Sequence, residues 1–147
     1  MLSDHQLSLV VLESDVMRTI LTPHATYEDS EREWFYRALA SIGSVITQNG
    51  VNVIFDATAN KRTYRERARA LIPRFVEVYI QCPLDVCMER DPKGIYRNAI
   101  AGNAATVPGL QIAYEPPDSA ELILDCRRSA GENADMVVEA LKQLRYI

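Results

Sequence analysis

The chain has 147 residues, of which 48% are hydrophobic and 24% are charged, and its formal net charge is −4. This composition is typical of one globular domain that buries about two-thirds of its unfolded surface, so we expect a single core over residues 1–147. The acidic balance argues against a broad surface for nucleic acid or acidic membranes, because such partners are bound through clustered cations.

Signals for export or membrane insertion are not found in the sequence. No apolar run reaches the roughly 20 residues that span a bilayer, and residues 1–5 are not a basic segment followed by an apolar stretch. We therefore expect a cytoplasmic protein without a membrane partner. Cys82, Cys87 and Cys126 lie in or beside apolar runs and are interpreted as reduced packing residues. No cysteine or histidine is assigned to a metal.

In chain order, the first half of the sequence predicts two strands around a helix. Residues 7–12 (LSLVVL) are nearly all apolar, a pattern typical of a strand buried on both faces of a parallel sheet. A capping box at Ser30–Glu33 predicts the start of a helix, which Gly50 ends. The second strand is predicted at residues 51–55 (VNVIF).

The same alternation continues past the middle of the chain. A capping box at Thr63–Glu66 predicts a basic helix that ends at Pro73. Residues 75–80 predict the third strand, and residues 83–89 predict a short helix with proline in its first turn. Two parallel strands joined through a helix are the unit from which such a sheet is built.

The last third combines a polar segment with one more strand and helix. Residues 91–117 contain glycines, prolines and small residues, so we expect a lid over a site. Residues 122–125 (LILD) predict the fourth strand, and a capping box at Ser129–Glu132 predicts the last helix. The alternation predicts a doubly wound α/β fold with ligands at the carboxyl ends of the strands.

Two aspartates stand where chemistry is expected. Asp15 follows the first strand, and Asp56 follows the second at the end of an apolar run. A carboxylate at a strand end of this kind can face Mg²⁺ or its water, as in a Walker B strand. The simpler interpretations are a helix cap for Asp15 and a turn residue for Asp56.

Three segments resemble the adenylylsulfate kinase family: residues 75–87 (FVEVYIQCPLDVC), 89–96 (ERDPKGIY) and 113–117 (AYEPP). The resemblance implies an ATP-dependent kinase that phosphorylates the ribose 3′-hydroxyl of adenosine 5′-phosphosulfate in sulfate assimilation, with ATP and Mg²⁺ as cofactors. It implies a three-layer P-loop kinase fold, small nucleotide substrates as partners and a homodimer as the expected oligomer.

The resemblance also suggests roles for residues in the first half of the chain. Residues 12–18 (LESDVMR) are similar to the family's Leu-Asp-Gly-Asp-Asn-Val-Arg motif, which implies that Asp15 orients or deprotonates the acceptor hydroxyl and that Arg18 holds an anionic part of the acceptor. Arg32 and Arg37 match basic, substrate-binding positions. An exposed helix cation is an equal alternative for Arg37.

Further positions follow from the match, with two departures. Arg62 aligns with a substrate-binding arginine, and the resemblance implies that Arg90 binds the nucleotide. Lys93 lies on a hinge after a rigid turn, and the resemblance implies that it brings positive charge over the transferring phosphoryl group. The family has an asparagine where this chain has Phe35, and a phenylalanine that stacks on the acceptor's adenine where it has Val107.

No G-x-x-x-x-G-K-[ST] phosphate loop occurs in the 147 residues. In the family this loop follows a first strand that lies between those matching residues 51–55 and 75–80. We expect a start that is truncated or misassigned, with residues 1–5 resembling the end of the family's first helix. Two alternatives stay open: a small kinase with another hydroxyl substrate, and a catalytically silent domain that binds a nucleotide or a partner.

Overall fold

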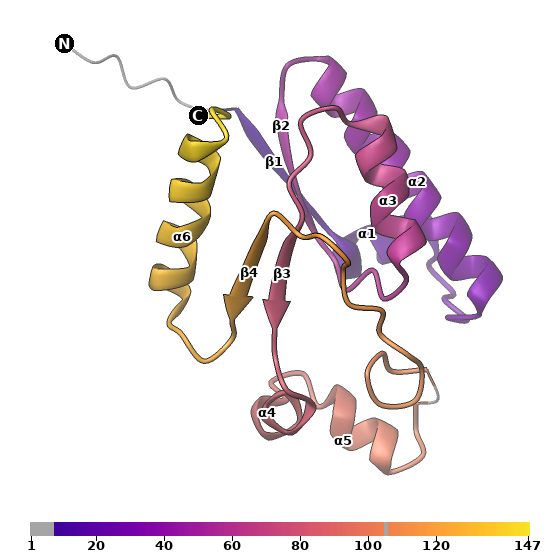
Figure 1. Ribbon diagram of the computed structural model, residues 1–147. Helices are drawn as coiled ribbons and strands as arrows, with labels where there is room; N and C mark the ends of the chain where they lie inside the picture. Colours follow the sequence, from indigo (N-terminus) through magenta and orange to yellow (C-terminus); the bar gives the residue numbers. More distant parts are fainter. Residues whose placement is uncertain (1–7, 105) are drawn as a thin grey trace. The chain divides into compact units, whose positions relative to one another are not determined.

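The computed structural model describes residues 8–104 and 106–147, and the chain divides into two compact units, Met1–Pro73 and Arg74–Ile147. Each unit contains one pair of parallel strands together with helices (Figure 1). The α/β class with parallel strands, predicted from the alternation of strands and helices, is therefore confirmed. Among the described residues, no helix combines the length and the apolar character that crossing a membrane requires.

Unit 1 has its two strands side by side, with the longest helix of the unit against them. Its elements are β1 (Leu9–Glu13), α1 (Ser14–Leu21), α2 (Asp29–Gln48), β2 (Asn52–Asp56) and α3 (Arg62–Leu71). The register places Leu9 opposite Asn52 and Glu13 opposite Asp56. Helix α2 packs against β2, and α3 packs beside α2 (Figure 1).

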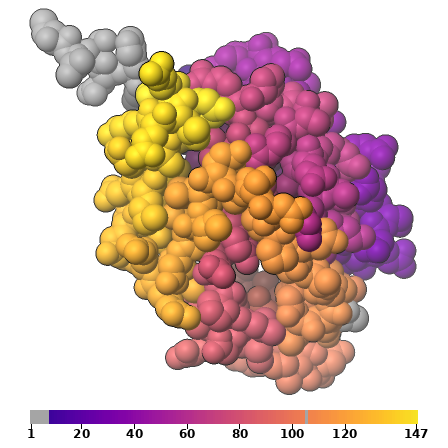
Figure 2. Space-filling view, viewed as in Figure 1, coloured from indigo at the N-terminus to yellow at the C-terminus, as the bar shows by residue number. Residues whose placement is uncertain are grey.

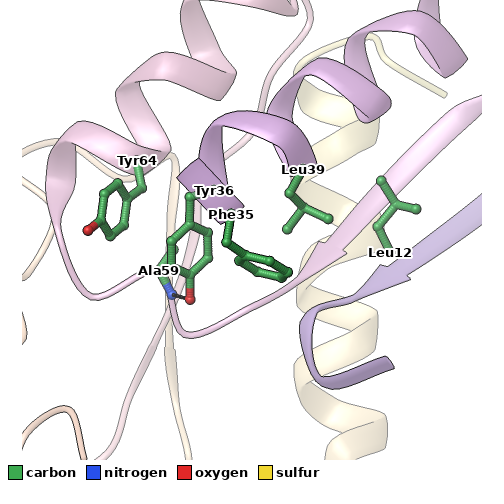
Figure 3. Packing of buried hydrophobic residues seen from close by; sticks show 6 residues of the cluster. All are labelled: Leu12, Phe35, Tyr36, Leu39, Ala59 and Tyr64. Carbon is green, nitrogen blue, oxygen red and sulfur yellow. Dashed lines mark hydrogen bonds between the residues drawn. The ribbon is translucent and has the colours of Figure 1, made fainter. Parts of the chain in front are cut away.

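The core of unit 1 lies between α2 and one face of the strand pair. Phe35 is fully buried, and Leu12, Tyr36, Leu39, Ala59 and Tyr64 complete the cluster (Figure 3). Helix α2 approaches β2 so closely at Gly43 that an added Cβ would lie 2.1 Å from Cζ of Phe55. The opposite face of β1 is open, with Val11 55% exposed. Burial of this strand on both faces, as its apolar run predicted, is wrong for the described residues, because α2 covers one face only.

Unit 2 is built around the second strand pair. Its elements are β3 (Val78–Gln81), α4 (Leu84–Arg90), α5 (Ile95–Ile100), β4 (Leu122–Asp125) and α6 (Ala130–Gln143). Val78 lies opposite Leu122, and Gln81 lies opposite Asp125. Helix α6, in yellow, forms part of the surface on the face that Figure 2 shows. The bounds of β4 are those predicted from the sequence.

One of the three predicted capping boxes is present. The Ser129 hydroxyl accepts a hydrogen bond from the Glu132 N–H at 3.2 Å, and the Glu132 carboxylate accepts one from the Ser129 N–H at 2.9 Å. Helices α2 and α3 each begin one residue before the predicted boxes at Ser30 and Thr63, and no side chain caps either N-terminus. Those two predictions are wrong, because each serine or threonine already lies inside the helix.

Helices α1 and α5 were not predicted from the sequence. Helix α5 lies within residues 91–117, the segment that composition alone assigned to a lid. The lid itself and the single domain over residues 1–147 stay predictions. Of the first predicted strand, Leu7 lies outside the described residues, as do residues 1–5 with their resemblance to the end of a family helix.

Candidate functional site

The ends of β1 and β2 place carboxylates at one edge of unit 1. Because the two strands are parallel and in register, Glu13 and Asp56 are neighbours at their carboxyl ends. Strand β1 continues directly into α1, whose first turn contains Asp15. All three side chains belong to exposed residues. This is the edge where ligands bind in parallel α/β sheets, so it is the candidate site of unit 1.

Arg18 extends from α1 into the interior of unit 1. The residue is 8% exposed, and its guanidinium carbon lies 4.0 Å from the centroid of the Phe35 ring and 4.9 Å from that of Tyr27. Arg18 Nη1 lies 3.3 Å from Oε1 of Glu31. A buried guanidinium requires such partners, because an uncompensated charge in the interior is strongly unfavourable.

Arg32, the second buried arginine of this region, meets Arg18 at the same aromatic ring. Arg32 is 5% exposed, its Nε donates to the Tyr27 carbonyl oxygen at 2.9 Å, and its guanidinium carbon lies 5.4 Å from the Tyr27 ring centroid. The structure thus brings together two of the predicted substrate-binding residues. It does so around Tyr27, a residue that the sequence interpretation missed.

Tyr27 combines exposure with an immobilised backbone. The residue is 43% exposed and has φ = 59°, in the left-handed region that non-glycine residues seldom adopt. Residues in such conformations persist only where their surroundings determine them strongly, and they cluster at functional sites. The sequence signal was weak, since it consists only of an aromatic residue two positions before a helix. An exposed ring next to two guanidinium groups is a suitable platform for a planar, anionic ligand.

Glu31 holds the segment that carries Tyr27. Its Oε2 accepts hydrogen bonds from Thr26 N–H at 2.6 Å and Thr26 Oγ1 at 3.0 Å, while Oε1 accepts one from Tyr27 N–H at 3.2 Å. Burial acts to raise the pKa of Glu31, but the hydrogen bonds from Thr26 and Tyr27 and the charge of Arg18 outweigh it and lower the pKa. The carboxylate is therefore ionised at neutral pH.

Helix α2 also fixes the loop that follows β2. The Ala59 N–H donates to the Tyr36 hydroxyl at 3.1 Å, and the Tyr36 and Tyr64 rings stack with centroids 4.6 Å apart (Figure 3). Phe35 meets Tyr36 edge to face at 5.2 Å. The position that holds asparagine in the resembled family is therefore a core position here, and its ring supports Arg18 from the inside.

Two further predicted substrate-binding residues of unit 1, Arg37 and Arg62, are not among the residues described around Tyr27. Arg37 is exposed on α2 and pairs with Glu33 at 3.7 Å, a carboxylate that Arg67 also contacts. Arg62 is the first residue of α3 and is half-buried. The contacts described for Arg37 are those of an ordinary surface helix cation, and the roles predicted for both arginines stay predictions.

Unit 2 displays the motif residues Arg90 and Lys93 at its surface. Arg90 ends α4, and its Nη1 donates to the carbonyl oxygen of Cys126, just after β4, at 2.8 Å. Asp91 accepts hydrogen bonds from the N–H groups of Tyr96 and Arg97 at 3.2 and 3.0 Å, which ties the turn to α5. Lys93 is exposed in that turn.

A cavity of about 390 Å³ lies at the carboxyl ends of β3 and β4. Its lining combines Gln81 and Asp125 from the strand ends with Arg127 and Arg128 from the turn after β4 and Met136 from α6. The position corresponds to the strand edge where ligands bind in this class of fold. The cavity offers both apolar surface and cationic groups.

The three cysteines are free thiols of unit 2. Burial, together with contacts to Cys126 and Cys87, raises the pKa of Cys82 to about 12, so this thiol is protonated at neutral pH. A protonated thiol is a poor nucleophile and a poor metal ligand. In the described part of the chain, no group of three or more histidine, cysteine or acidic residues is arranged to hold a metal ion.

Comparison with known proteins identifies the family. The sequence profile described as Adenylylsulphate kinase matches residues 1–125. The chain belongs to the adenylylsulphate kinase family. Two curated relatives are the adenylyl-sulfate kinase of Rippkaea orientalis, 34% identical over 95% of this chain and 78% of its own length, and the probable adenylyl-sulfate kinase of Pyrococcus abyssi, 35% identical over 93% and 79%. The family is one of kinases.

Solved structures agree with this assignment. The APS kinase CysC of Mycobacterium tuberculosis, in complex with AMPPNP and APS, superposes with a TM-score of 0.86 at 30% identity, over 92% of this chain and 81% of that one. A hexameric APS kinase from Thiobacillus denitrificans has a TM-score of 0.68 at 21% identity over 96% of this chain and 24% of its own, which shows the fold alone. The P-loop kinase type of fold, predicted from the resemblance, is confirmed.

Proposed function

We propose that this member of the adenylylsulphate kinase family acts in the transfer of the ATP γ-phosphoryl group to the 3′-hydroxyl of adenosine 5′-phosphosulfate, a step of sulfate assimilation. Family membership, the names of the curated relatives and the AMPPNP and APS in the Mycobacterium tuberculosis structure support the proposal. The observation that carries it is the convergence of Arg18 and Arg32 on the exposed ring of Tyr27.

The Tyr27 platform matches the chemistry of this acceptor. Stacking of a base on an aromatic side chain contributes about 1–3 kcal/mol, and the ring of Tyr27 is backed by protein groups that limit its movement. Guanidinium groups beside the ring suit the phosphosulfate, because arginine forms paired hydrogen bonds with anionic oxygens. Tyr27 takes over the stacking role that the absence of phenylalanine at Val107 leaves open.

Asp15 is proposed to position the acceptor hydroxyl. The residue is exposed in the first turn of α1, at the ligand-binding edge of the strands. Its carboxylate would accept the 3′-hydroxyl proton while the hydroxyl oxygen forms its bond to the γ-phosphorus and the bond between that phosphorus and ADP breaks. The products are the 3′-phosphorylated acceptor and ADP.

Asp56 and its cross-strand neighbour Glu13 fit a magnesium ion. Mg²⁺ prefers oxygen ligands and is bound through one or two carboxylates plus water and substrate phosphates, so two carboxylates at adjacent strand ends suffice. When bound, the ion would neutralise charge on the β- and γ-phosphates. Asp56 is the proposed ligand, directly or through water.

The donor side of the reaction involves groups in unit 2 and a phosphate loop. We propose that Arg90 contacts the nucleotide and that Lys93 brings charge to the transferring group as residues 91–117 close as a lid. The 147 residues contain no G-x-x-x-x-G-K-[ST] motif, and such a loop provides the grip on the β- and γ-phosphates in P-loop kinases. We therefore propose that acceptor binding needs only the residues described, whereas transfer also needs a phosphate loop.

The different requirements of acceptor binding and phosphoryl transfer can be tested in two steps. Calorimetric titration of the 147-residue chain with adenosine 5′-phosphosulfate should show binding, and Tyr27→Ala should weaken it by roughly tenfold, as expected for the loss of one stacking contact. ADP release is then measured in a chain extended at its N-terminus by a strand, a G-x-x-x-x-G-K-[ST] loop and a helix, with a panel of hydroxyl acceptors. ADP release with a different hydroxyl acceptor, and not with adenosine 5′-phosphosulfate, would contradict this proposal and indicate a kinase of another small substrate.

A further inference from the structure

One carboxylate connects the three parts of the candidate acceptor site. Glu31 lies in the first turn of α2, 13 residues from Arg18 of α1, and its side chain is 16% exposed. Through Oε1 it contacts Arg18 and the N–H of Tyr27, and through Oε2 it accepts both the N–H and the hydroxyl of Thr26. Glu31 thus joins α1, the segment before α2, and α2 itself.

These contacts oppose the conformational preference of Tyr27. A tyrosine with φ = 59° returns to the common regions of backbone space unless neighbouring groups hold it. Two groups hold it here: Glu31 binds its N–H, and Arg32 binds its carbonyl oxygen at 2.9 Å. The backbone on both sides of the Tyr27 ring is therefore fixed by charged side chains of α2.

Glu31 also acts on Arg18 through charge. The Arg18 side chain is only 9% exposed, and Glu31 is the carboxylate with which it forms an ion pair in the structure. Its guanidinium also lies near the rings of Phe35, Tyr27 and Tyr36, which bring no formal charge. Removing the carboxylate would leave a buried cation with weaker compensation, so its position would change.

We propose that Glu31 is a positioning residue for the acceptor: without touching the acceptor, it holds Tyr27 and Arg18 where they bind the base and the anionic group. The inference rests on the proposed acceptor site. It predicts that acceptor affinity depends on Glu31 through Tyr27 and Arg18, so the contribution of Glu31 becomes smaller once the Tyr27 ring is removed.

The test compares two glutamates that make the same kinds of bonds. Glu31→Gln keeps the shape of the side chain and removes its charge, and we expect affinity for adenosine 5′-phosphosulfate to fall by roughly tenfold, the scale of one charge-assisted hydrogen bond. Glu132→Gln is the matched control, because Glu132 also accepts from a backbone N–H and a hydroxyl, those of Ser129 in unit 2. It should leave acceptor affinity unchanged.

A double-mutant cycle separates positioning from a general loss of structure. In a Tyr27→Ala chain, the further change Glu31→Gln should lower affinity by clearly less than in the wild type, because the part of its effect that acts through the Tyr27 ring is already lost and only the part through Arg18 remains. If Glu31→Gln reduces folding, Thr26→Val removes the hydroxyl donor to Oε2, together with the longer contact of that hydroxyl with the Glu28 N–H at 3.4 Å, and should weaken binding by roughly threefold. Melting temperatures measured in parallel identify variants that do not fold.

The outcomes distinguish this inference from the proposed function. A wild-type chain that does not bind adenosine 5′-phosphosulfate overturns the proposed acceptor site, and the inference falls with it. Wild-type binding that is weakened by Tyr27→Ala but unchanged by Glu31→Gln and by Thr26→Val overturns the inference alone. Full additivity of the two changes in the cycle also contradicts it, whereas strong coupling with an unaffected Glu132→Gln control supports it.

Discussion

The two units differ in how the residues that we predict to be functional are held. In unit 1, Arg18 and Arg32 are buried and fixed by Phe35, Tyr27 and Glu31. In unit 2, Arg90 and Lys93 belong to residues 89–96, one of the segments that resemble the family, yet both are exposed. The proposed acceptor site of unit 1 consists of side chains that already hold one another in place, whereas the motif of unit 2 provides cations at the surface, which suits groups that move onto a substrate.

Removing the ring of Phe35 should have the largest effect on unfolding. Phe35 is fully buried and supports Arg18 at 4.0 Å, so Phe35→Ala should lower the free energy of unfolding by about 3–5 kcal/mol. Urea denaturation measures this. The adjacent Trp34 is 50% exposed, and Trp34→Ala should cost much less. Equal losses for both variants would contradict a site built on a packed core.

A single methyl group tests the close packing of unit 1. Gly43→Ala would place Cβ 2.1 Å from Phe55 Cζ, so we expect a loss of about 1–3 kcal/mol in unfolding free energy. Gly131→Ala in α6 meets no atom within 4 Å and should be neutral or slightly stabilising. A lower melting temperature for Gly43→Ala alone would confirm the close packing of α2 on β2. A neutral Gly43→Ala would show that α2 and β2 have room to separate.

The pH dependence of stability should change when Glu31 is replaced. The pKa of Glu31 is lowered in the folded chain, so its contribution to stability is present above its ordinary value of 4.5 and is lost as pH falls through the folded pKa. Glu31→Gln should therefore reduce stability at pH 7 and have progressively less effect below pH 4.5. Thermal melts between pH 3 and 7 provide the measurement, and a constant difference across this range would contradict the assignment.

Lys93→Ala should have the smallest effect on folding. Lys93 is exposed in a turn, so the free energy of unfolding should stay within about 0.5 kcal/mol of the wild-type value. ADP release in a chain extended by a phosphate loop should nevertheless fall by at least tenfold if Lys93 brings charge to the transferring group. Unchanged release would remove Lys93 from the proposed mechanism.

Sequence patterns predicted features that depend on neighbouring residues along the chain, but not the contacts that depend on how the elements pack. The run at residues 122–125 gave the bounds of β4, and Ser129 caps α6 as expected, because both signals are local. The bonds of Glu31 could not be predicted in the same way, since they depend on where α1 places Arg18. Tyr27 was missed for the same reason. A cytoplasmic location and a homodimer stay predictions.

Mapping where the acceptor binds would show whether its site lies in unit 1. Nuclear magnetic resonance spectra of the 147-residue chain, titrated with adenosine 5′-phosphosulfate, would show which residues respond. We expect the largest shifts at Tyr27, Thr26, Arg18 and Arg32, all of unit 1, with smaller changes in unit 2. Shifts concentrated around Arg90 and Lys93, or no shifts at saturating ligand, would contradict an acceptor site assembled in unit 1.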